Sequence, residues 1–569
     1  MRAAIMKKIC VALCALGISF TAIPGPASAR VADDYSKFEI NACVSGEPTT
    51  LDPTMIEEVS AANYTVHLFD NLMRYQSSEE NAAAGDDDND SVKKSQLILG
   101  QAESYEMTED GLEYTFHLRD DIYWSDGVPV TADDFVYSWR RLVDPASAAG
   151  YGFILEDVLK NAKEIRSNKA EPETLGVEAV DEKTVRFSLK APCAYFLDLC
   201  TFPNTMPLRQ DVIEKYGREW TDPEHIVTNG AFLLQRWVHD SSIRMIRNKR
   251  FYDPAVPDAI NWTLSSGNSS QLAAFMAKEC DFFNTVPSDL IEGLRAEGCC
   301  HVAPQLGTSF LYLSASRIPD WRVRAAICLA IDRQNIIEHV TQGGQLPANS
   351  LTANGINTWD ENEWTTNGDF MTKELKERYP DADLDTYSGR CELAQKLLEE
   401  AVADGFDKSV HLDYMYTATD YAQAQAEAIQ SDLSTVLDLN VTLTNVEAQT
   451  SLHNLQTGNI TMSGTGWVAD YNDPKSFLLL MESASPYNAS RWSNEKYDAL
   501  LRQAETLPNT KERDELLAEA EQLLFSENGF CIVPLFYYTQ PYCIHDEAVR
   551  NVVYLSGGEF LFTYATTGK

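Results

Sequence analysis

Alternating hydrophobic and polar positions mark short strands along the chain. Residues 114–119 (YTFHLR) and 184–189 (TVRFSL) alternate with the period of two that is typical of a half-buried strand. Residues 37–43 (KFEINAC) also predict a strand, because the turn residues Gly46 and Pro48 follow them. Further strands are predicted at 441–445 and 532–537.

Apolar residues at helical spacing separate these strands. After Thr131, which suits a helix cap, Phe135, Trp139 and Leu142 recur at the spacing of one helix face. Other amphipathic helices are predicted at 321–332, 391–403, 421–436 and 511–525. This alternation of strands and helices indicates α/β domains. The 569 residues exceed what one hydrophobic core holds, so we expect at least two domains.

The N-terminus has the features of an export signal. Three basic residues in the first eight positions precede an apolar stretch at 9–20, and residues 27–29 (ASA) form a small-residue cleavage site. The stretch is shorter than the ~20 residues that span a bilayer. We expect a signal peptide over 1–29 and an exported protein in a periplasm or at the cell surface. Cys14 fits the lipidation pattern poorly, which leaves a lipid anchor as the disfavoured alternative.

Acidic residues dominate the charge of the chain. The formal net charge of -39 repels nucleic acid and anionic membranes, so no nucleic-acid partner is expected. Residues 78–93 (SSEENAAAGDDDNDSV) concentrate acidic and turn-forming residues and predict a surface loop. Most of this charge is interpreted as a well-solvated surface.

Ten of the 12 cysteines follow the predicted signal. Disulfides persist in exported proteins, but none of these cysteines has the C-x-x-C spacing of zinc and redox sites. Spacing alone leaves the connectivity open, with buried free thiols as the alternative. The pairs considered are Cys193–Cys200, Cys531–Cys543, and Cys280 with either Cys299 or Cys300.

Motifs for catalysis are absent from the sequence. It has no P-loop, no H-E-x-x-H and no G-x-S-x-G nucleophile elbow, and its nine histidines are scattered. We therefore expect no enzyme activity, no cofactor and no metal site. Acidic pairs such as Asp120 and Asp121 are common, but a glycosidase pair is defined by its separation in space. An exported hydrolase using an acidic pair stays as an alternative of another class.

Several blocks of sequence resemble a known family in their order and spacing. They occur at 47–53 (EPTTLDP), 62–75 (ANYTVHLFDNLMRY), 114–145 (YTFHLRDDIYWSDGVPVTADDFVYSWRRLVDP), 228–232 (TNGAF), 247–252 (RNKRFY), 322–326 (RVRAA) and 466–472 (GWVADYN). The chain thereby resembles the family 5 solute-binding proteins, the oligopeptide and dipeptide binders of ABC importers. The resemblance covers essentially the whole chain after the signal.

The resemblance implies an α/β fold with two lobes around a cleft. This is the periplasmic-binding-protein type II-like architecture (cluster C), with an extra domain inserted in the first lobe and closure of the lobes by a hinge. Lobe I would comprise 30–69, 210–306 and 541–569, the inserted domain 70–209, and lobe II 307–540.

The resemblance also implies how a ligand is held. Backbone strand addition would bind the ligand main chain, and the Asp470 carboxylate would hold the ligand amino group through a charge-assisted hydrogen bond. The motif at 466–472 supplies Gly466, Trp467, Val468, Asp470 and Asn472. The facing segment supplies Glu57 and Val59, and the aromatic positions lining the ligand are Tyr151 and Tyr538.

Departures from the family pattern concern the other end of the ligand. Some oligopeptide binders hold the ligand carboxylate with an Arg where this chain has Gly464, and with a His near 421–422, where none occurs. A disulfide of some members would join Gly307 and Val468, and both are non-Cys here.

The expected ligand is a peptide or an amine-bearing small solute, and the expected partner is an ABC transporter permease in the membrane. The protein is expected to be a monomer. A non-peptide solute or a signalling peptide on the same fold stays as an alternative.

Overall fold

The computed structural model describes residues 37–44, 46–77, 92–93, 95–265, 267–360, 362–364, 368–555 and 558–568. The predicted signal at 1–29 and most of the predicted acidic loop lie outside these ranges. The chain divides into two units, Met1–Lys37 and Phe38–Lys569, and the fold below is that of the second unit. None of the helices described there is long and apolar enough to cross a membrane.

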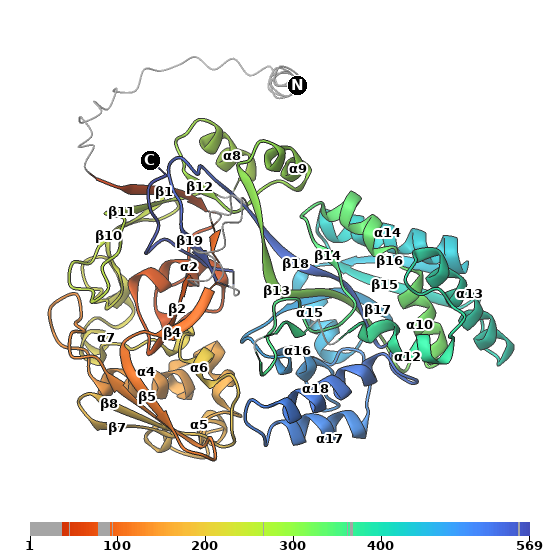
Figure 1. The fold of residues 1–569 in the computed structure, drawn as a ribbon, viewed down its shortest axis with the longest axis horizontal. Coiled ribbons are helices and arrows are strands. Elements are labelled where there is room, and N and C mark those ends of the chain that lie inside the picture. The colour runs from red at the N-terminus through yellow and green to blue at the C-terminus, as the bar shows by residue number, and fades with distance from the viewer. Residues whose placement is uncertain are drawn as a thin grey trace. The chain divides into compact units, whose positions relative to one another are not determined.

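An 11-stranded sheet runs through this unit (Figure 1). Its strand order is β16-β15-β17-β13-β18-β12-β1-β11-β10-β9, and β14 pairs with β18 outside this path. The strands are β1 (Glu39–Val44), β9 (Phe232–Val238), β10 (Ser242–Arg247), β11 (Ala259–Leu264), β12 (Phe282–Phe283), β13 (Cys300–Leu313), β14 (Leu346–Pro347), β15 (His411–Thr417), β16 (Asn440–Val446), β17 (Met462–Val468) and β18 (Ile532–Ile544).

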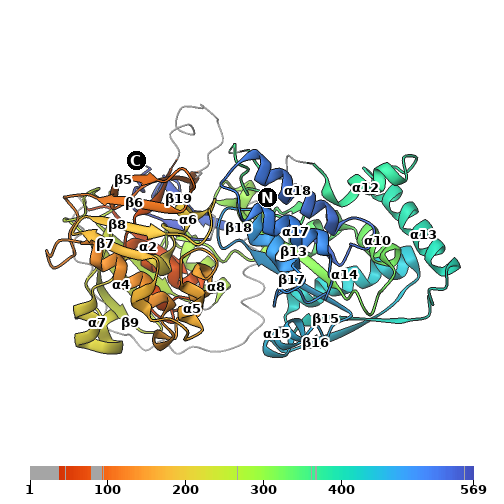
Figure 2. The ribbon, with the colours of Figure 1, turned by 90° about the horizontal axis from the view of Figure 1, so that it is seen from below.

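Smaller sheets complete the β structure. A four-stranded antiparallel sheet has the order β5-β6-β8-β7, β2 pairs with β4, and β20, β19 and β3 form a third group. These strands are β2 (Met73–Ser77), β3 (Val92–Lys93), β4 (Ser95–Leu99), β5 (Ala102–Met107), β6 (Glu113–Leu118), β7 (Val177–Asp181), β8 (Thr184–Ser188), β19 (Val552–Tyr554) and β20 (Phe560–Leu561). Helix α4 (Ala132–Val143) packs on β7 and β8, as the view from below shows (Figure 2).

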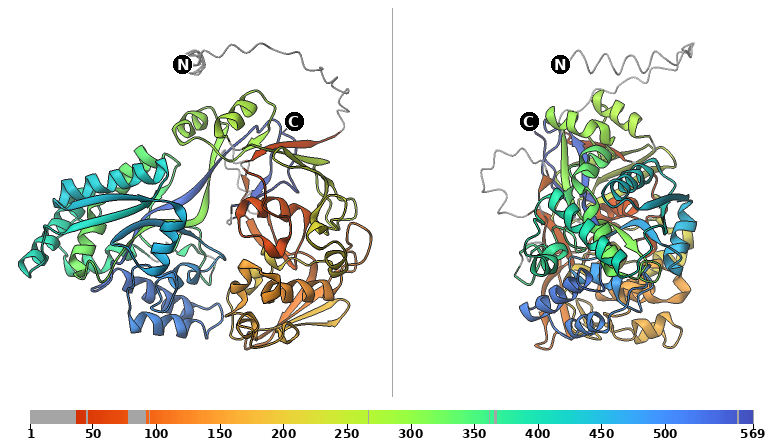
Figure 3. Two further views of the ribbon diagram at one scale, coloured as in Figure 1. Left: turned by 180° about the vertical axis from the view of Figure 1, so that it is seen from behind. Right: turned by 90° about the vertical axis from the view of Figure 1, so that its right-hand side faces the viewer.

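The remaining α-helices pack around these sheets. They are α2 (Val59–Leu68), α5 (Ala162–Arg166), α6 (Phe196–Leu199), α7 (Gln210–Tyr216), α8 (Asn268–Met276), α9 (Ser288–Ala296), α10 (Trp321–Ala330), α11 (Arg333–Ile336), α12 (Phe370–Arg378), α13 (Tyr387–Ala403), α14 (Asp420–Leu437), α15 (Ala448–Thr457), α16 (Lys475–Leu478), α17 (Glu495–Ala504) and α18 (Lys511–Leu524). Helices α8 and α9 pack beside β12 and β13 (Figure 3).

Two large hydrophobic cores lie toward opposite ends of the long strands β13 and β18. One core collects residues from Ile40 to Leu264 together with C-terminal residues such as Tyr542 and Phe562. The other collects residues from Leu306 to Tyr537. Because β13 and β18 pair along most of their length and carry residues of both cores, they are the main connection between the two lobes. The α/β class and the two-lobed type II-like architecture are as predicted.

Most predicted elements agree with the structure. The helices at 132–143, 321–330, 387–403, 420–437 and 511–524 and the strands at 39–44, 113–118 and 184–188 lie where periodicity put them. Of two long strands, β18 was predicted only in part and β13 was not predicted. Strand β18 continues seven residues past the predicted end at 537, through polar residues and Pro541.

Two of the considered cysteine pairs are wrong. Cys531 precedes β18 and Cys543 lies near its end, so an extended strand separates them by about 40 Å at roughly 3.3 Å per residue. Cys280 makes a thiol–thiol hydrogen bond with Cys43 instead of meeting Cys299 or Cys300. Cys193 and Cys200 are both buried and, like the other described cysteines, are not linked in the structure.

Candidate functional site

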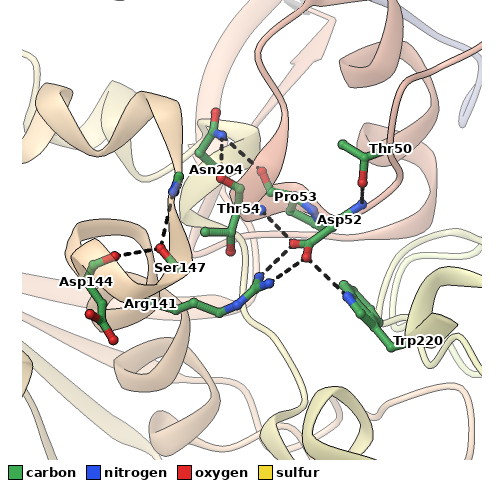
Figure 4. A network of polar contacts seen from close by, with 10 residues as sticks. Thr50, Asp52, Pro53, Thr54, Arg141, Asp144, Ser147, Asn204 and Trp220 are labelled. Carbon is green, nitrogen blue, oxygen red and sulfur yellow. Dashed lines mark hydrogen bonds and ion pairs between the residues drawn. The ribbon is translucent and has the colours of Figure 1, made fainter. Parts of the chain in front are cut away.

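The segment before α2 is held rigidly by one buried carboxylate (Figure 4). Asp52 accepts hydrogen bonds from both terminal nitrogens of Arg141 on α4, at 2.8 and 2.7 Å, and from the indole of Trp220 at 3.1 Å. The side-chain amide of Asn204 donates to the carbonyl groups of Pro53 and Ile56, each at 3.0 Å. Side chains from three distant segments thus fix the backbone that leads to Glu57.

Glu57 and Val59 follow this fixed segment. Val59 is the first residue of α2. The exposed Glu57 side chain lies over Gly150, where an added Cβ would meet the Glu57 carboxylate oxygen at 2.0 Å. Tyr151, next in the chain, is half-buried and its ring contacts Phe202, with centroids 5.8 Å apart. Burial, followed by the negative charges of Asp470 and Glu57, raises the pKa of Tyr151 to about 12. Tyr151 therefore lies within electrostatic range of both carboxylates.

Strand β17 carries the facing motif and has one open edge. Gly307 to Leu313 of β13 pair with the whole of β17, whereas β15 pairs only with Met462 and Ser463. Among the described strands, none pairs with the second edge of 464–468. Ala469 donates its N–H to the Leu306 carbonyl, so the alternation of an antiparallel pair turns the backbone groups of Gly466 and Val468 away from β13.

Two glycines make room for Tyr538 beside this edge. A Cβ on Gly466 would meet the Tyr538 hydroxyl oxygen at 1.9 Å, and one on Gly307 would meet the Tyr538 ring at 2.5 Å. Trp467, by contrast, is half-buried against the lobe II core, and its indole donates to Ser476 at 3.4 Å. Tyr538 thus packs directly over the motif strand, and Trp467 helps to hold that strand in place.

The turn after β17 is fixed by two buried groups. The Ser476 hydroxyl oxygen accepts the Asp470 N–H at 3.0 Å. The Asp473 carboxylate forms a two-point ion pair with Arg513 of α18, at 2.8 and 2.9 Å, and both side chains are almost completely buried. The Asn472 side chain accepts the Asn357 N–H at 2.8 Å. Among Asp470, Asn472 and Asp473, only the Asp470 side chain has no hydrogen bond or ion pair in the described structure.

Asp470 lines a cavity of about 1050 Å³, counting the space that opens to solvent. No hydrogen bond or ion pair engages its carboxylate within the described structure, and burial raises its pKa to about 6. Of the other predicted residues whose side chains the structure describes, only Asn472 lines this cavity. Gly466, Trp467, Val468, Tyr538, Glu57 and Tyr151 lie outside its lining.

From the sequence, no binding role was assigned to the rest of the cavity lining. It includes Arg74 and Tyr75 of β2, Asp198 of α6 and Glu559 before β20. Tyr471 also lines it and stacks on Tyr195, with ring centroids 3.6 Å apart. Within the ranges that the structure describes, no three or more His, Cys, Asp or Glu side chains are grouped as a metal ion would require. The cavity presents carboxylates, aromatic rings and the Arg74 side chain.

Gly464 explains why this chain departs from an Arg anchor. A Cβ at this position would meet the hydroxyl of Tyr414 at 2.6 Å, and Tyr414 is buried on the neighbouring strand β15. An Arg side chain could not be accommodated without displacing Tyr414. The space beside Gly464 that a longer side chain would need is therefore occupied by Tyr414.

Comparisons with known proteins agree over most of the chain. Residues 96–489 match the model described as bacterial extracellular solute-binding proteins, family 5 Middle. The periplasmic oligopeptide-binding protein OppA of Salmonella typhimurium is 34% identical over 531 residues, covering 91% of this chain and 90% of that protein. The probable deoxycholate-binding periplasmic protein YgiS of Escherichia coli is 31% identical over 500 residues, covering 86% of each chain.

Solved structures give the same result. The unliganded open form of MppA, a periplasmic murein tripeptide-binding protein, superposes with a TM-score of 0.72 at 28% identity, covering 89% of this chain and 93% of that one. OppA of Haemophilus influenzae in complex with the peptide RPPGFSPFR superposes with a TM-score of 0.71 at 28% identity, covering 94% of this chain and 99% of that one.

Proposed function

This chain belongs to family 5 of the bacterial extracellular solute-binding proteins, and we propose that it is the exported subunit of an ABC importer that captures peptides by their amino end. The observation that carries the proposal is the Asp470 carboxylate, which lines the cavity without a partner of its own. A ligand ammonium group would supply that partner. The pairing would offset the cost of keeping a carboxylate out of water.

The open edge of β17 supports strand addition. The backbone groups of Gly466 and Val468 face away from β13, so an extended peptide can pair with them as an additional strand. Such main-chain hydrogen bonds are common to all peptides and favour broad specificity. Tyr538, packed over Gly466, would flank the ligand, and Tyr151 with Glu57 would face it from lobe I.

The ligand carboxylate is proposed to be free of an Arg clamp at Gly464. Tyr414 fills the space above that residue, so neither the sequence nor the packing offers a cation there. Peptides of different lengths would then bind through their amino end alone. Asn472, which bonds to the backbone of Asn357, would help to hold the loop that borders the cavity.

The domain boundaries are proposed as predicted, with lobe I at 30–69, 210–306 and 541–569, the inserted domain at 70–209 and lobe II at 307–540. The change of core between Ala303 and Leu306, and again between Tyr537 and Tyr542, supports the lobe boundaries. Bending of β13 and β18 would close the lobes on the ligand as a hinge. The closed monomer would then present both lobes to a membrane permease.

The charge of the cavity bears on the choice of ligand. Asp198, Asp470 and Glu559 would repel an anionic solute such as deoxycholate, the ligand in the name of the relative YgiS. A cationic amine is favoured by the same groups.

The chain is a non-catalytic binding protein, because its relatives over most of its length are binding proteins and not enzymes. The alternative of an exported hydrolase is set aside for that reason.

Replacing Asp470 by Asn tests the proposal. Loss of a charge-assisted hydrogen bond should weaken binding of a tripeptide such as Ala-Ala-Ala by about 1.5–3 kcal/mol, or ~10–150-fold. N-acetylation of the peptide should weaken binding to the wild-type protein by a similar factor and to the variant by little more. Calorimetry that gives the same affinity for both proteins would refute the amino anchor.

A further inference from the structure

Besides Asp70 and Asp470, two further carboxylates line the cavity on the side of lobe I. Glu559, immediately before β20, is 9% exposed, and Asp198 lies on α6. Apart from its own backbone N–H, the Glu559 carboxylate has no partner in the described part of the chain. Asp198 accepts a hydrogen bond from the Tyr75 hydroxyl, and burial, followed by the charges of Asp198 and Glu559, raises the pKa of Tyr75. The two carboxylates therefore lie around one tyrosine.

The nearby cation does not neutralise this pair. Arg74 also lines the cavity, but its guanidinium is ion-paired with Asp253 and stabilised by the charge of Asp70. Burial raises the pKa of Glu559 to about 7 and that of Asp198 to about 6. Keeping these two carboxylates ionised without a cation costs free energy. A ligand with a positive charge would offset that cost.

We propose that Glu559 and Asp198 form a subsite for a second positive charge, so that the preferred ligand is a peptide with both a free amino end and a lysine or arginine side chain near it. This inference rests on the proposed function, because Asp470 in the same cavity would hold the amino end. The aromatic residues Phe69, Phe202 and Phe251 also line the cavity and would cover the aliphatic part of the basic side chain.

Matched peptides test the subsite on the unmodified protein. Calorimetry at pH 8, above the raised pKa values, would compare Lys-Ala-Ala with norleucine-Ala-Ala, and Ala-Lys-Ala with Ala-norleucine-Ala. Norleucine keeps the aliphatic chain and lacks the charge. We expect the lysine peptide of at least one pair to bind about ten- to a hundredfold more tightly. Equal affinities within both pairs would overturn the proposal.

Variants separate the subsite from the amino anchor. Glu559→Gln should reduce the preference for lysine about tenfold and leave the affinity for the norleucine peptide within about twofold. Asp470→Asn should weaken both peptides in parallel and preserve the preference. Glu547→Gln, an exposed carboxylate of the same C-terminal segment, is the matched control. A preference for lysine that survives in Glu559→Gln and in Asp198→Asn would overturn the subsite while leaving the amino anchor intact.

A different observation concerns five cysteines gathered at the lobe I end of β13 and β18. Cys43, Cys280, Cys300 and Cys543 are buried in one small core with α8 and α9, and Cys299 packs against it. Cys300 and Cys543 are direct partners in the antiparallel pair of β13 and β18. Ile544 donates its N–H to the Cys299 carbonyl, so Cys300 and Cys543 occupy the neighbouring position without backbone hydrogen bonds. Cα atoms in such a pair are ~4.5 Å apart, within the range of disulfides.

We infer that the exported protein carries disulfides between Cys300 and Cys543 and between Cys43 and Cys280. The Cys543 thiol hydrogen-bonds both Cys299 and Cys300, and the direct cross-strand pairing selects Cys300. The Cys43 and Cys280 thiols hydrogen-bond each other. Each bond forms as two thiols lose two protons and two electrons to a disulfide of a thiol oxidase or a small-molecule disulfide, which is reduced to two thiols. The Cys300–Cys543 bond would link the two strands that connect the lobes. The Cys43–Cys280 bond would link β1 to the turn before β12.

Peptide mapping of the native exported protein tests these bonds. After alkylation and proteolysis without reductant, we expect linked peptides for Cys43–Cys280 and Cys300–Cys543, and reductant should lower the melting temperature by several degrees. Cys280→Ser should remove one link and leave the other, whereas Cys391→Ser, which is outside the cluster, should remove neither. Full alkylation of all five cysteines in the native, unreduced protein after unfolding would overturn the inference.

Discussion

Gly466 decides how closely Tyr538 approaches the motif strand. Its missing Cβ leaves the space that the Tyr538 hydroxyl occupies, and Gly307 on the paired strand does the same for the ring. From the sequence motif, Gly466 is expected to offer its backbone groups to a ligand. The structure adds a steric role, since any larger residue would displace the aromatic side chain beside the open edge of β17.

Gly466→Ala should therefore be destabilising. The added methyl group overlaps Tyr538, and overpacking of this kind costs about 1–3 kcal/mol. Denaturant unfolding measures the loss, and the double variant with Tyr538→Leu should recover much of it. Gly293→Ala on α9, where an added Cβ has open space, serves as the control and should be neutral or slightly stabilising. Equal stability of Gly466→Ala and wild type would contradict the steric role.

His67 is a second residue whose environment sets a measurable property. Its Nδ1–H donates to the Asn63 carbonyl at 2.8 Å and its Nε2 accepts the Phe562 N–H at 3.0 Å, so the ring is neutral. Complete burial lowers its pKa from 6.5 to about 4. As pH falls, His67 is therefore protonated near pH 6.5 in the unfolded chain and only near pH 4 in the folded protein.

Stability should fall in acid, because the unfolded chain protonates His67 at a higher pH than the folded protein does. The stability associated with neutral His67 is fully present above pH 6.5 and is lost progressively as pH falls toward 4. Over this window wild type should lose up to about 1.4 kcal/mol per pH unit more than His67→Gln. Unfolding free energies measured from pH 7.5 to 4 give the two slopes. The exposed variant His339→Gln should keep the wild-type slope, and identical slopes for His67→Gln and wild type would refute the assignment.

At the scale of elements, the site depends on how distant segments are joined. Among the described strands, none pairs with the segment at 50–56, and the Asp52 carboxylate holds this segment through Arg141 of α4 and Trp220 (Figure 4). On the facing side, Asp473 and Arg513 join the turn after β17 to α18. Both ion pairs are mostly shielded from water, so removal of one partner leaves a buried charge.

Arg141→Gln should be strongly destabilising for this reason. Leaving the Asp52 carboxylate without its cation should cost about 3 kcal/mol, whereas loss of an exposed pair costs at most about 1 kcal/mol. The matched control is Arg186→Gln, which removes the exposed ion pair with Glu178. Denaturant unfolding of the two variants gives the comparison. Similar losses of unfolding free energy in the two variants would contradict a larger contribution from the buried Asp52 network.

At the scale of the whole molecule, the two lobes contribute different carboxylates to one cavity. Asp470 comes from the lobe II core region, and Asp198 and Glu559 come from segments packed with the lobe I core. A ligand with two positive charges would join them and favour the closed form. The net charge of -39 adds a general attraction for cations that salt would screen.

Binding of a cationic peptide should accordingly weaken in acid. Asp470 and Asp198 have pKa values raised to about 6 and Glu559 to about 7, so all three are ionised above pH 8 and protonate as pH falls. Each group with a pKa of 6 should reduce the affinity about tenfold at pH 5. Calorimetry of Lys-Ala-Ala between pH 8 and pH 5 measures the effect. Asp470→Asn should show a shallower dependence, and a flat profile in wild type would contradict these ionisations.

Sequence by itself determined the elements and the family. Periodicity located α4, α10, α13, α14 and α18, because a buried face imposes a regular spacing on apolar residues. The motif at 466–472 identified Asp470 and Asn472, both of which line the cavity.

Only the tertiary structure decided the rest. It brought Asp198 and Glu559 to the same cavity from positions 361 residues apart, set Cys543 opposite Cys300, and extended β18 past its predicted end. Such contacts depend on which strands pair and where segments cross. No local spacing along the chain carries that information.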